Sequence, residues 1–146
     1  MNLLEDVVDR PMNQAVQVGN VYKIAMTSEE GITPKDGYTS RDKYFVVLGF
    51  DDRGNVYGGV VVNSKINPNL PSTVTDYYMP LSKKDYPFLQ YDSFVNCSQL
   101  KMAHVNKLAA ATMVGGISTE DLDIIKGTVV ESPNETRIRL KQFGLL

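Results

Sequence analysis

Cationic and aromatic side chains suited to binding nucleic acid gather within ten positions of the first third of the chain: Lys35, Tyr38, Arg41, Lys43 and Tyr44. Cations pair with phosphates and aromatic rings stack on unpaired bases, so this combination is typical of surfaces that hold single-stranded nucleic acid. Segment 27–43 is rich in glycine, proline and hydroxyl residues, which predicts a long loop of a kind that is often functional. The alternative is a solvated loop whose tyrosines pack back on the protein.

Metal and nucleophile chemistry have few candidates. His104 is the one histidine and Cys97 the one cysteine, and because structural zinc takes four ligands drawn mainly from these types, we predict no metal and no cofactor. A Cys97–His104 nucleophile pair is formally possible, but no helix N-terminus is apparent to lower the thiol pKa. The pattern favours a small buried hydrophobe at Cys97 and a satisfied or surface histidine at His104. The pair Gly115-Gly116 lacks the lysine of a phosphate loop and is interpreted as a turn.

Length and charge narrow the class of protein. The 146 residues are 42% hydrophobic and 22% charged, with a formal net charge of −2, which is ordinary for one globular domain spanning 1–146. Binding of nucleic acid would therefore depend on a local basic face. A chain with one cysteine forms no internal disulfide. Glu5 and Asp6 stand where a signal peptide carries cations. No stretch approaches the ~20 apolar residues that a membrane span needs. These features predict a cytoplasmic protein.

Runs of apolar and β-branched residues predict the strands that position these side chains. Three clear strands and three weaker ones follow from such runs: 21–25, 44–50, 56–62, 76–81, 93–96 and 100–105. Segment 51–55 carries a glycine and joins the second and third strands as a hairpin. The dipeptide Gly58-Gly59 inside the return strand predicts a bulge or tight bend.

One helix is predicted near the C-terminal end, over 119–131. Ser118 supplies a capping hydroxyl before the acids of the first turn, and Pro133 ends the helix. Its core-facing stripe comprises Leu122, Ile125 and Val129, with Ile124 beside them.

Two flanking segments complete the chain: a lead-in over 1–18, and a tail over 134–146 that alternates basic and apolar residues like an edge strand or docking segment. Many short strands followed by one helix predict a mostly β fold, a small closed barrel whose core spans about 19–131.

Four stretches match a known pattern in order and spacing: Gly19-Asn20-Val21-Tyr22; Lys43 to Leu48; Val60 to Ser64; and the run Ser93-x-Val95-x-x-x-Gln99-Leu100, followed by Lys107-Leu108 and Gly115-Gly116-Ile117-Ser118. Together they cover roughly three-quarters of the chain with the segments between them. This arrangement resembles the PemK/MazF toxins of type II toxin–antitoxin systems. The resemblance implies an SH3-like barrel, usually a homodimer, that cuts single-stranded RNA without a metal.

The family reaction implies a set of site residues. A ribose 2′-OH attacks its own 3′-phosphate while side chains act as base, acid and cation around that phosphate. Mapped onto this sequence, the catalytic residues are Lys43, with Arg41 two positions away, and Asn63 and Ser64. The cationic and aromatic residues Lys35, Tyr38 and Tyr44 would then bind the RNA. Lys43 stands where the family has arginine, Asn63 where it has threonine, and Tyr44 where it has proline. Lysine keeps the charge but loses the two-pronged grip on phosphate.

Three functions are open at this point. The first is an endoribonuclease toxin, whose cognate antitoxin would be an acidic peptide competing with RNA for the same positive face. The second is a catalytically inactive barrel that binds RNA or a protein. The third is a structural or regulatory protein with no role at nucleic acid.

Overall fold

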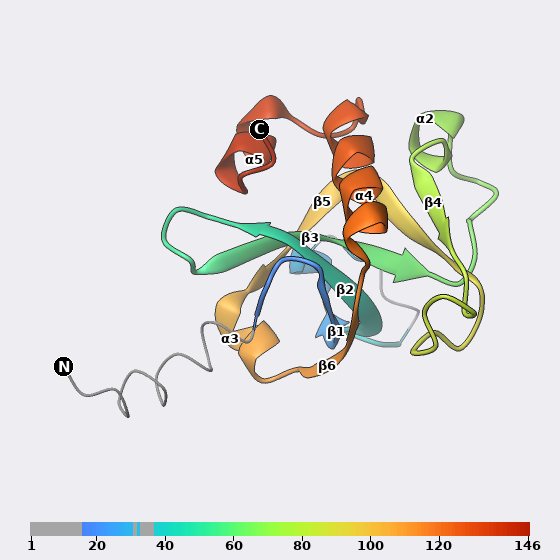
Figure 1. The fold of residues 1–146 in the computed structure, drawn as a ribbon, viewed down its shortest axis with the longest axis horizontal. Helices are drawn as coiled ribbons and strands as arrows, with labels where there is room; N and C mark the ends of the chain where they lie inside the picture. The colour runs from blue at the N-terminus through green and yellow to red at the C-terminus, as the bar shows by residue number, and fades with distance from the viewer. Residues whose placement is uncertain (1–15, 31, 33–36) are drawn as a thin grey trace.

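The computed structural model describes residues 16–30, 32 and 37–146. Its centre is one curved six-stranded sheet in the order β4-β5-β3-β2-β1-β6, in which every neighbouring pair is antiparallel (Figure 1). The strands are β1 (Asn20–Met26), β2 (Arg41–Phe50), β3 (Val56–Asn63), β4 (Tyr78–Leu81), β5 (Ser93–His104) and β6 (Thr112–Gly116). The helical elements are η1 (Ser28–Glu30), α2 (Ser72–Thr75), α3 (Val105–Ala109), α4 (Thr119–Glu131) and α5 (Arg137–Gln142).

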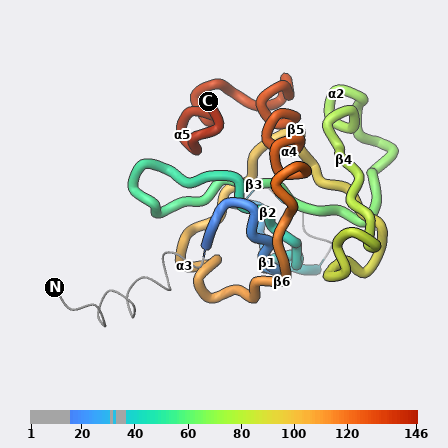
Figure 2. Tube along the Cα trace, viewed as in Figure 1, coloured from blue at the N-terminus to red at the C-terminus, as the bar shows by residue number. Residues whose placement is uncertain are grey.

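The predicted fold class, a mostly β barrel with a helix at 119–131, is confirmed. The chain passes from β6 directly into α4 (Figure 2). The hydroxyl of Ser118 caps α4 by accepting from the amide of Asp121, as predicted. Ile125 and Val129 are fully buried, whereas Ile124 is 54% exposed and does not belong to the core-facing stripe.

Alternation along the strands divides the apolar side chains between two cores. On β2, Val46 faces one cluster of buried residues, to which α4 and α5 contribute, and Phe45 faces a second cluster, to which Leu108 of α3 contributes. Val60 on β3 lies opposite Val46, and Val61 lies opposite Phe45, so each pair shares a face. Lys43 continues the Phe45 face beyond the apolar part of the strand, because side chains two positions apart share a side.

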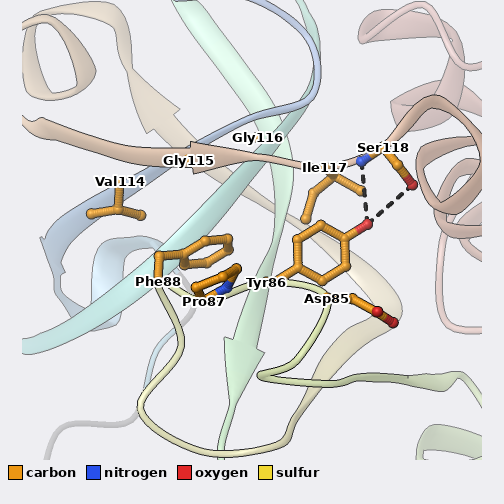
Figure 3. Close-up of a pocket in the computed structure, with 9 residues that line it drawn as sticks. All are labelled: Asp85, Tyr86, Pro87, Phe88, Val114, Gly115, Gly116, Ile117 and Ser118. Atoms are coloured by element: carbon orange, nitrogen blue, oxygen red, sulfur yellow. Dashed lines mark hydrogen bonds between the residues drawn. The ribbon is translucent and has the colours of Figure 1, made fainter.

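The two edge strands, β4 and β6, are joined by side chains of the segment that follows β4. The Tyr86 hydroxyl donates its proton to the Asp121 carboxylate at 2.5 Å. Its oxygen lies 3.1 Å from Ser118 Oγ and accepts from the Ser118 amide at 3.2 Å (Figure 3). Phe88 lies against Gly115 of β6, where an added Cβ would come within 2.8 Å of the ring. Burial, with the nearby carboxylate of Asp121, raises the pKa of Tyr86, so the hydroxyl keeps its proton.

Three elements differ from the sequence-based expectation. Residues 93–96 and 100–105 were expected as two strands, but 93–104 form the continuous β5 and Val105 begins α3. The segment between the two expected strands is a bulge and not a break. Gly115-Gly116 was expected as a turn but forms the end of β6, because both glycines pair with β1. The Phe88 ring occupies the position where a side chain at Gly115 would lie. The tail forms α5 in place of an edge strand; Thr136 caps it, and Leu140 and Phe143 are buried, so the alternative expectation of a docking segment is correct.

The predicted bulge at Gly58-Gly59 is confirmed, because the register of β3 shifts against both neighbouring strands there. A Cβ at Gly59 would lie 2.1 Å from the Val46 carbonyl oxygen. A backbone carbonyl cannot move aside as a flexible side chain can. Position 59 therefore has no room for a Cβ and requires glycine.

Gly59→Ala is therefore expected to lower the free energy of unfolding by about 1–3 kcal/mol, the usual range for overpacking. The control is Gly127→Ala on the exposed face of α4, where an added Cβ meets nothing within 4 Å. That change is expected to raise stability by about 0.5–1 kcal/mol, because alanine favours a helix interior. Urea unfolding followed by circular dichroism measures both; equal stability of the two variants would contradict the packing described.

Candidate functional site

A groove of about 950 Å³ opens where the polar ends of β2 and β3 meet β4 and β5. Its lining carries five cationic side chains: Lys23, Arg41, Lys43, Lys65 and Lys101. Asp42 is the one carboxylate among the described residues that line it. A protein with net charge −2 thus concentrates positive charge in one hollow, which attracts anionic ligands independently of the overall balance.

The pairing of β2 with β3 brings Lys43 and Asn63 together. Tyr44 lies opposite Val62, so the next pair outward is Lys43 with Asn63, and the Lys43 ammonium donates a hydrogen bond to Asn63 Oδ1. Burial, reinforced by the positive charge of Arg41, lowers the pKa of Lys43 from 10.5 to about 8. An amine with this pKa is charged at neutral pH and gives up its proton readily, as a general acid must.

Asn63 also contacts Tyr78 of β4 through a side-chain hydrogen bond. Tyr78 is half-buried and lines the groove. Burial raises the pKa of its hydroxyl, and the hydrogen bond with Asn63 opposes part of that rise. Lys43, Asn63 and Tyr78, from three different strands, thus form one hydrogen-bonded row along the groove.

The structure brings together the four residues predicted to be catalytic. Arg41, Lys43, Asn63 and Ser64 all line the groove. Arg41 and Lys43 begin β2, however, and do not belong to the loop that was expected to extend to residue 43. A strand holds these two cations more rigidly than a loop would.

The three residues predicted to bind RNA have different placements. Tyr44 lines the groove and follows Lys43 on β2, but its ring packs edge-on against Phe88 with centroids 5.6 Å apart. Tyr38 is 71% exposed and is not part of the groove lining. Lys35 lies outside the described residues. The assignment of these residues to RNA stays a prediction.

Sequence reasoning missed the contribution of β4 and β5. Tyr78, Asn96, Gln99 and Lys101 line the groove, but they lie 30 or more positions from Arg41 and Lys43 in the sequence. A usable signal was the group of polar residues Asn96, Ser98 and Gln99 within a strand that carries several apolar residues, because buried strands rarely hold so many polar residues unless a site uses them.

The C-terminal segment holds the bulge of β5 that presents Gln99 and Lys101. The Glu135 carboxylate, whose side chain has 0% exposure, accepts from the Leu100 amide at 2.7 Å. Arg139 donates to the Leu100 carbonyl at 2.7 Å and forms an ion pair with Glu135 at 3.3 Å. These contacts satisfy the backbone of Leu100 at the point where the register between β3 and β5 shifts.

Cys97 and His104 do not form a reactive pair. Cys97 is fully buried in the core, and burial raises the pKa of its thiol to about 12. His104 is exposed at the far end of β5, where its Nδ1 accepts from the Asn106 amide as the cap of α3. The expectations for the two residues are confirmed. In the part of the chain that the structure describes, no group of three histidine, cysteine or acidic residues converges as a metal site, and no helix is long and apolar enough to cross a membrane.

Comparison with known proteins gives evidence for the fold. No model of a protein family matches the chain, and no curated protein matches its sequence. A solved structure, the crystal structure of MazE-MazF (Form-III) from Deinococcus radiodurans, matches with a TM-score of 0.56 and 10% sequence identity over 83% of this chain and 98% of that chain. This chain has a MazF-like fold. The resemblance seen in the sequence is thus supported at the level of the fold.

The ammonium of Lys43 is expected to titrate with a midpoint near pH 8. Arg41→Met removes a nearby positive charge and should raise that midpoint, because the charged form is then less disfavoured. Arg53→Met, at the exposed tip of the β2–β3 hairpin, is the control and should leave it unchanged. NMR titration of the lysine side-chain carbons measures the midpoint, with the Lys43 signal identified by its loss in Lys43→Met. A midpoint near 10.5 in the wild type would contradict the burial of this charge.

Proposed function

We propose that this protein is a metal-independent endoribonuclease of the PemK/MazF type that cleaves single-stranded RNA and inhibits growth. The observation that carries the proposal is the convergence of five cations with Asn63 and Ser64 in one groove. The MazF-like fold supports it. A groove open to solvent suits an unpaired strand, whose phosphates can follow a row of cations.

The two cations at the start of β2 fit different roles. Arg41 is permanently protonated, so it serves to hold the phosphate and stabilise the charge of the phosphorane. Lys43 has a pKa of about 8 and is able to transfer a proton near neutral pH. Ser64 and Asn63 supply hydrogen-bond donors for the phosphate oxygens, because both residues line the groove.

The reaction is an internal transesterification. The 2′-oxygen forms a bond to the adjacent phosphorus as it loses its proton to water in the open groove, and the bond from phosphorus to the 5′-oxygen breaks. The protonated Lys43 gives its proton to the departing 5′-oxygen. The products are a 2′,3′-cyclic phosphate and a 5′-hydroxyl, so no metal-bound water is needed. Asn63 Oδ1 accepts from Lys43 and keeps the ammonium aimed into the groove.

The proposal extends to a partner and an assembly. The matched structure is that of a MazE-MazF complex, and a groove with five cations and one acid suits an extended acidic antitoxin segment that competes with RNA. A homodimer, as the family resemblance implies, completes the proposal.

Cleavage of a long unstructured RNA in the presence of EDTA tests the proposal. The wild type is expected to produce fragments with 5′-hydroxyl ends, at a rate that declines above about pH 8 as Lys43 loses its proton. The double variant Arg41→Ala/Lys43→Ala should lose at least about 100-fold in rate, because it removes both the cation and the acid.

The control is Lys83→Ala/Lys84→Ala, which removes two neighbouring exposed cations that are not part of the groove lining; it should cleave like the wild type. No cleavage by the wild type at high protein concentration would refute the ribonuclease. Salt-dependent retention of RNA without cleavage would indicate instead the inactive binding barrel.

A further inference from the structure

Tyr78 occupies a position in the groove that neither the sequence pattern nor the family resemblance assigns. It begins β4, the edge strand beyond β5, and lies opposite Asn96. Asn96 in turn lies opposite Val61 of β3. Asn63 is two positions beyond Val61 on the same strand, so both point to the face that Tyr78 and Asn96 occupy. The curvature of the sheet thus brings an aromatic hydroxyl from its edge to the residue that holds Lys43.

The amide of Asn63 links the two groups with a defined polarity. Its Oδ1 accepts the hydrogen bond from the Lys43 ammonium. Because Oδ1 is taken by Lys43, the NH₂ group of the amide is left to donate to the Tyr78 oxygen. A phenol that accepts from Asn63 keeps its own O–H to donate elsewhere.

Burial makes this hydroxyl a lasting donor. Because burial raises the pKa of Tyr78 above its ordinary value of 10.0, the phenol stays protonated throughout the range in which Lys43 is charged. It cannot act as the base, and it adds no charge to the groove. A neutral, preoriented O–H beside a cation is the kind of group that stabilises charge developing on a phosphate oxygen.

We propose that the Tyr78 hydroxyl donates a hydrogen bond to a non-bridging oxygen of the same phosphate that Arg41 and Lys43 engage, with Asn63 as the residue that orients both Lys43 and Tyr78. This inference rests on the proposed ribonuclease function and adds a catalytic residue to it. Proton transfer stays with Lys43. Tyr78 stabilises the negative charge of the phosphorane, and its hydroxyl contacts only one of the two non-bridging oxygens.

Tyr78→Phe keeps the ring and removes only the hydroxyl, so it tests the proposal directly. The variant is expected to lose about 10- to 100-fold in kcat with a much smaller change in KM, because the donor acts mainly in the transition state. Tyr77→Phe is the matched control, since Tyr77 is the adjacent tyrosine and is not part of the groove lining; it should keep the wild-type kcat. Equal melting temperatures of the three proteins would show that the fold is intact.

A sulfur-substituted RNA distinguishes a contact to the phosphate from a purely structural role. Sulfur accepts hydrogen bonds weakly, so the wild type should cleave one phosphorothioate diastereomer at the scissile position more slowly than the other. In Tyr78→Phe that discrimination should shrink toward unity, because the hydroxyl that sensed the oxygen is gone. A variant that is slower but keeps the full discrimination would overturn the proposal and make Tyr78 a support for Asn63.

The outcomes separate this inference from the proposed function. If the wild type cleaves no RNA, the ribonuclease itself is refuted and Tyr78 has no reaction to assist. If the wild type cleaves and Tyr78→Phe cleaves at the same rate with the same discrimination, the role of Tyr78 is refuted and the ribonuclease stands.

Discussion

The register between β2 and β3 is the constraint on which both the core and the groove depend. Opposite pairs along these strands supply Val46 and Val60 to one core and Phe45 and Val61 to the other. The same register, continued one pair outward, places Lys43 against Asn63. A slip of one residue would turn every side chain to the other face, so apolar packing enforces the polar contact. The close approach of Gly59 to the Val46 carbonyl holds the register at the opposite end.

The cationic side chains of the groove repel one another, and the fold holds them together in spite of that repulsion. Burial and Arg41 both disfavour the charged form of Lys43, and the side-chain amide of Asn63 compensates only in part. A phosphate would relieve that repulsion, which is a physical reason for an anionic ligand to bind here in spite of the net charge of −2. Burial first, and the repulsion from Arg41 second, give Lys43 a pKa at which proton transfer is efficient. The charge of Arg41 therefore favours both the binding of an anion and the acidity of Lys43.

Local patterns predicted the fold well where they are strong. Runs of β-branched and aromatic residues identified β2 and β3, and the Ser118 cap with Pro133 delimited α4. The local sequence could not predict that β5 is continuous. The backbone groups of Leu100 at its bulge are hydrogen-bonded by Glu135 and Arg139, which lie at the far end of the chain. For the same reason Lys101 and Tyr78 escaped prediction: strand pairing across long sequence separations places them in the groove, and no motif carries that information. The family resemblance led to Arg41, Lys43, Asn63 and Ser64, which all line the groove; their catalytic role stays a prediction.

The salt dependence of RNA affinity tests the central claim, that the groove binds a single strand through its cations. Each phosphate paired on a single strand contributes about 0.7 to the slope of log affinity against log salt. With five cations in the groove, three to five paired phosphates correspond to a slope between about −2 and −3.5. Fluorescence anisotropy with a short single-stranded RNA that carries 2′-O-methyl ribose at every position, and so cannot be cleaved, measures it. Such a slope for the wild type, reduced by about one to one and a half in Arg41→Ala/Lys43→Ala, is the predicted result. A slope near zero, or one that the double variant leaves unchanged, would contradict the account.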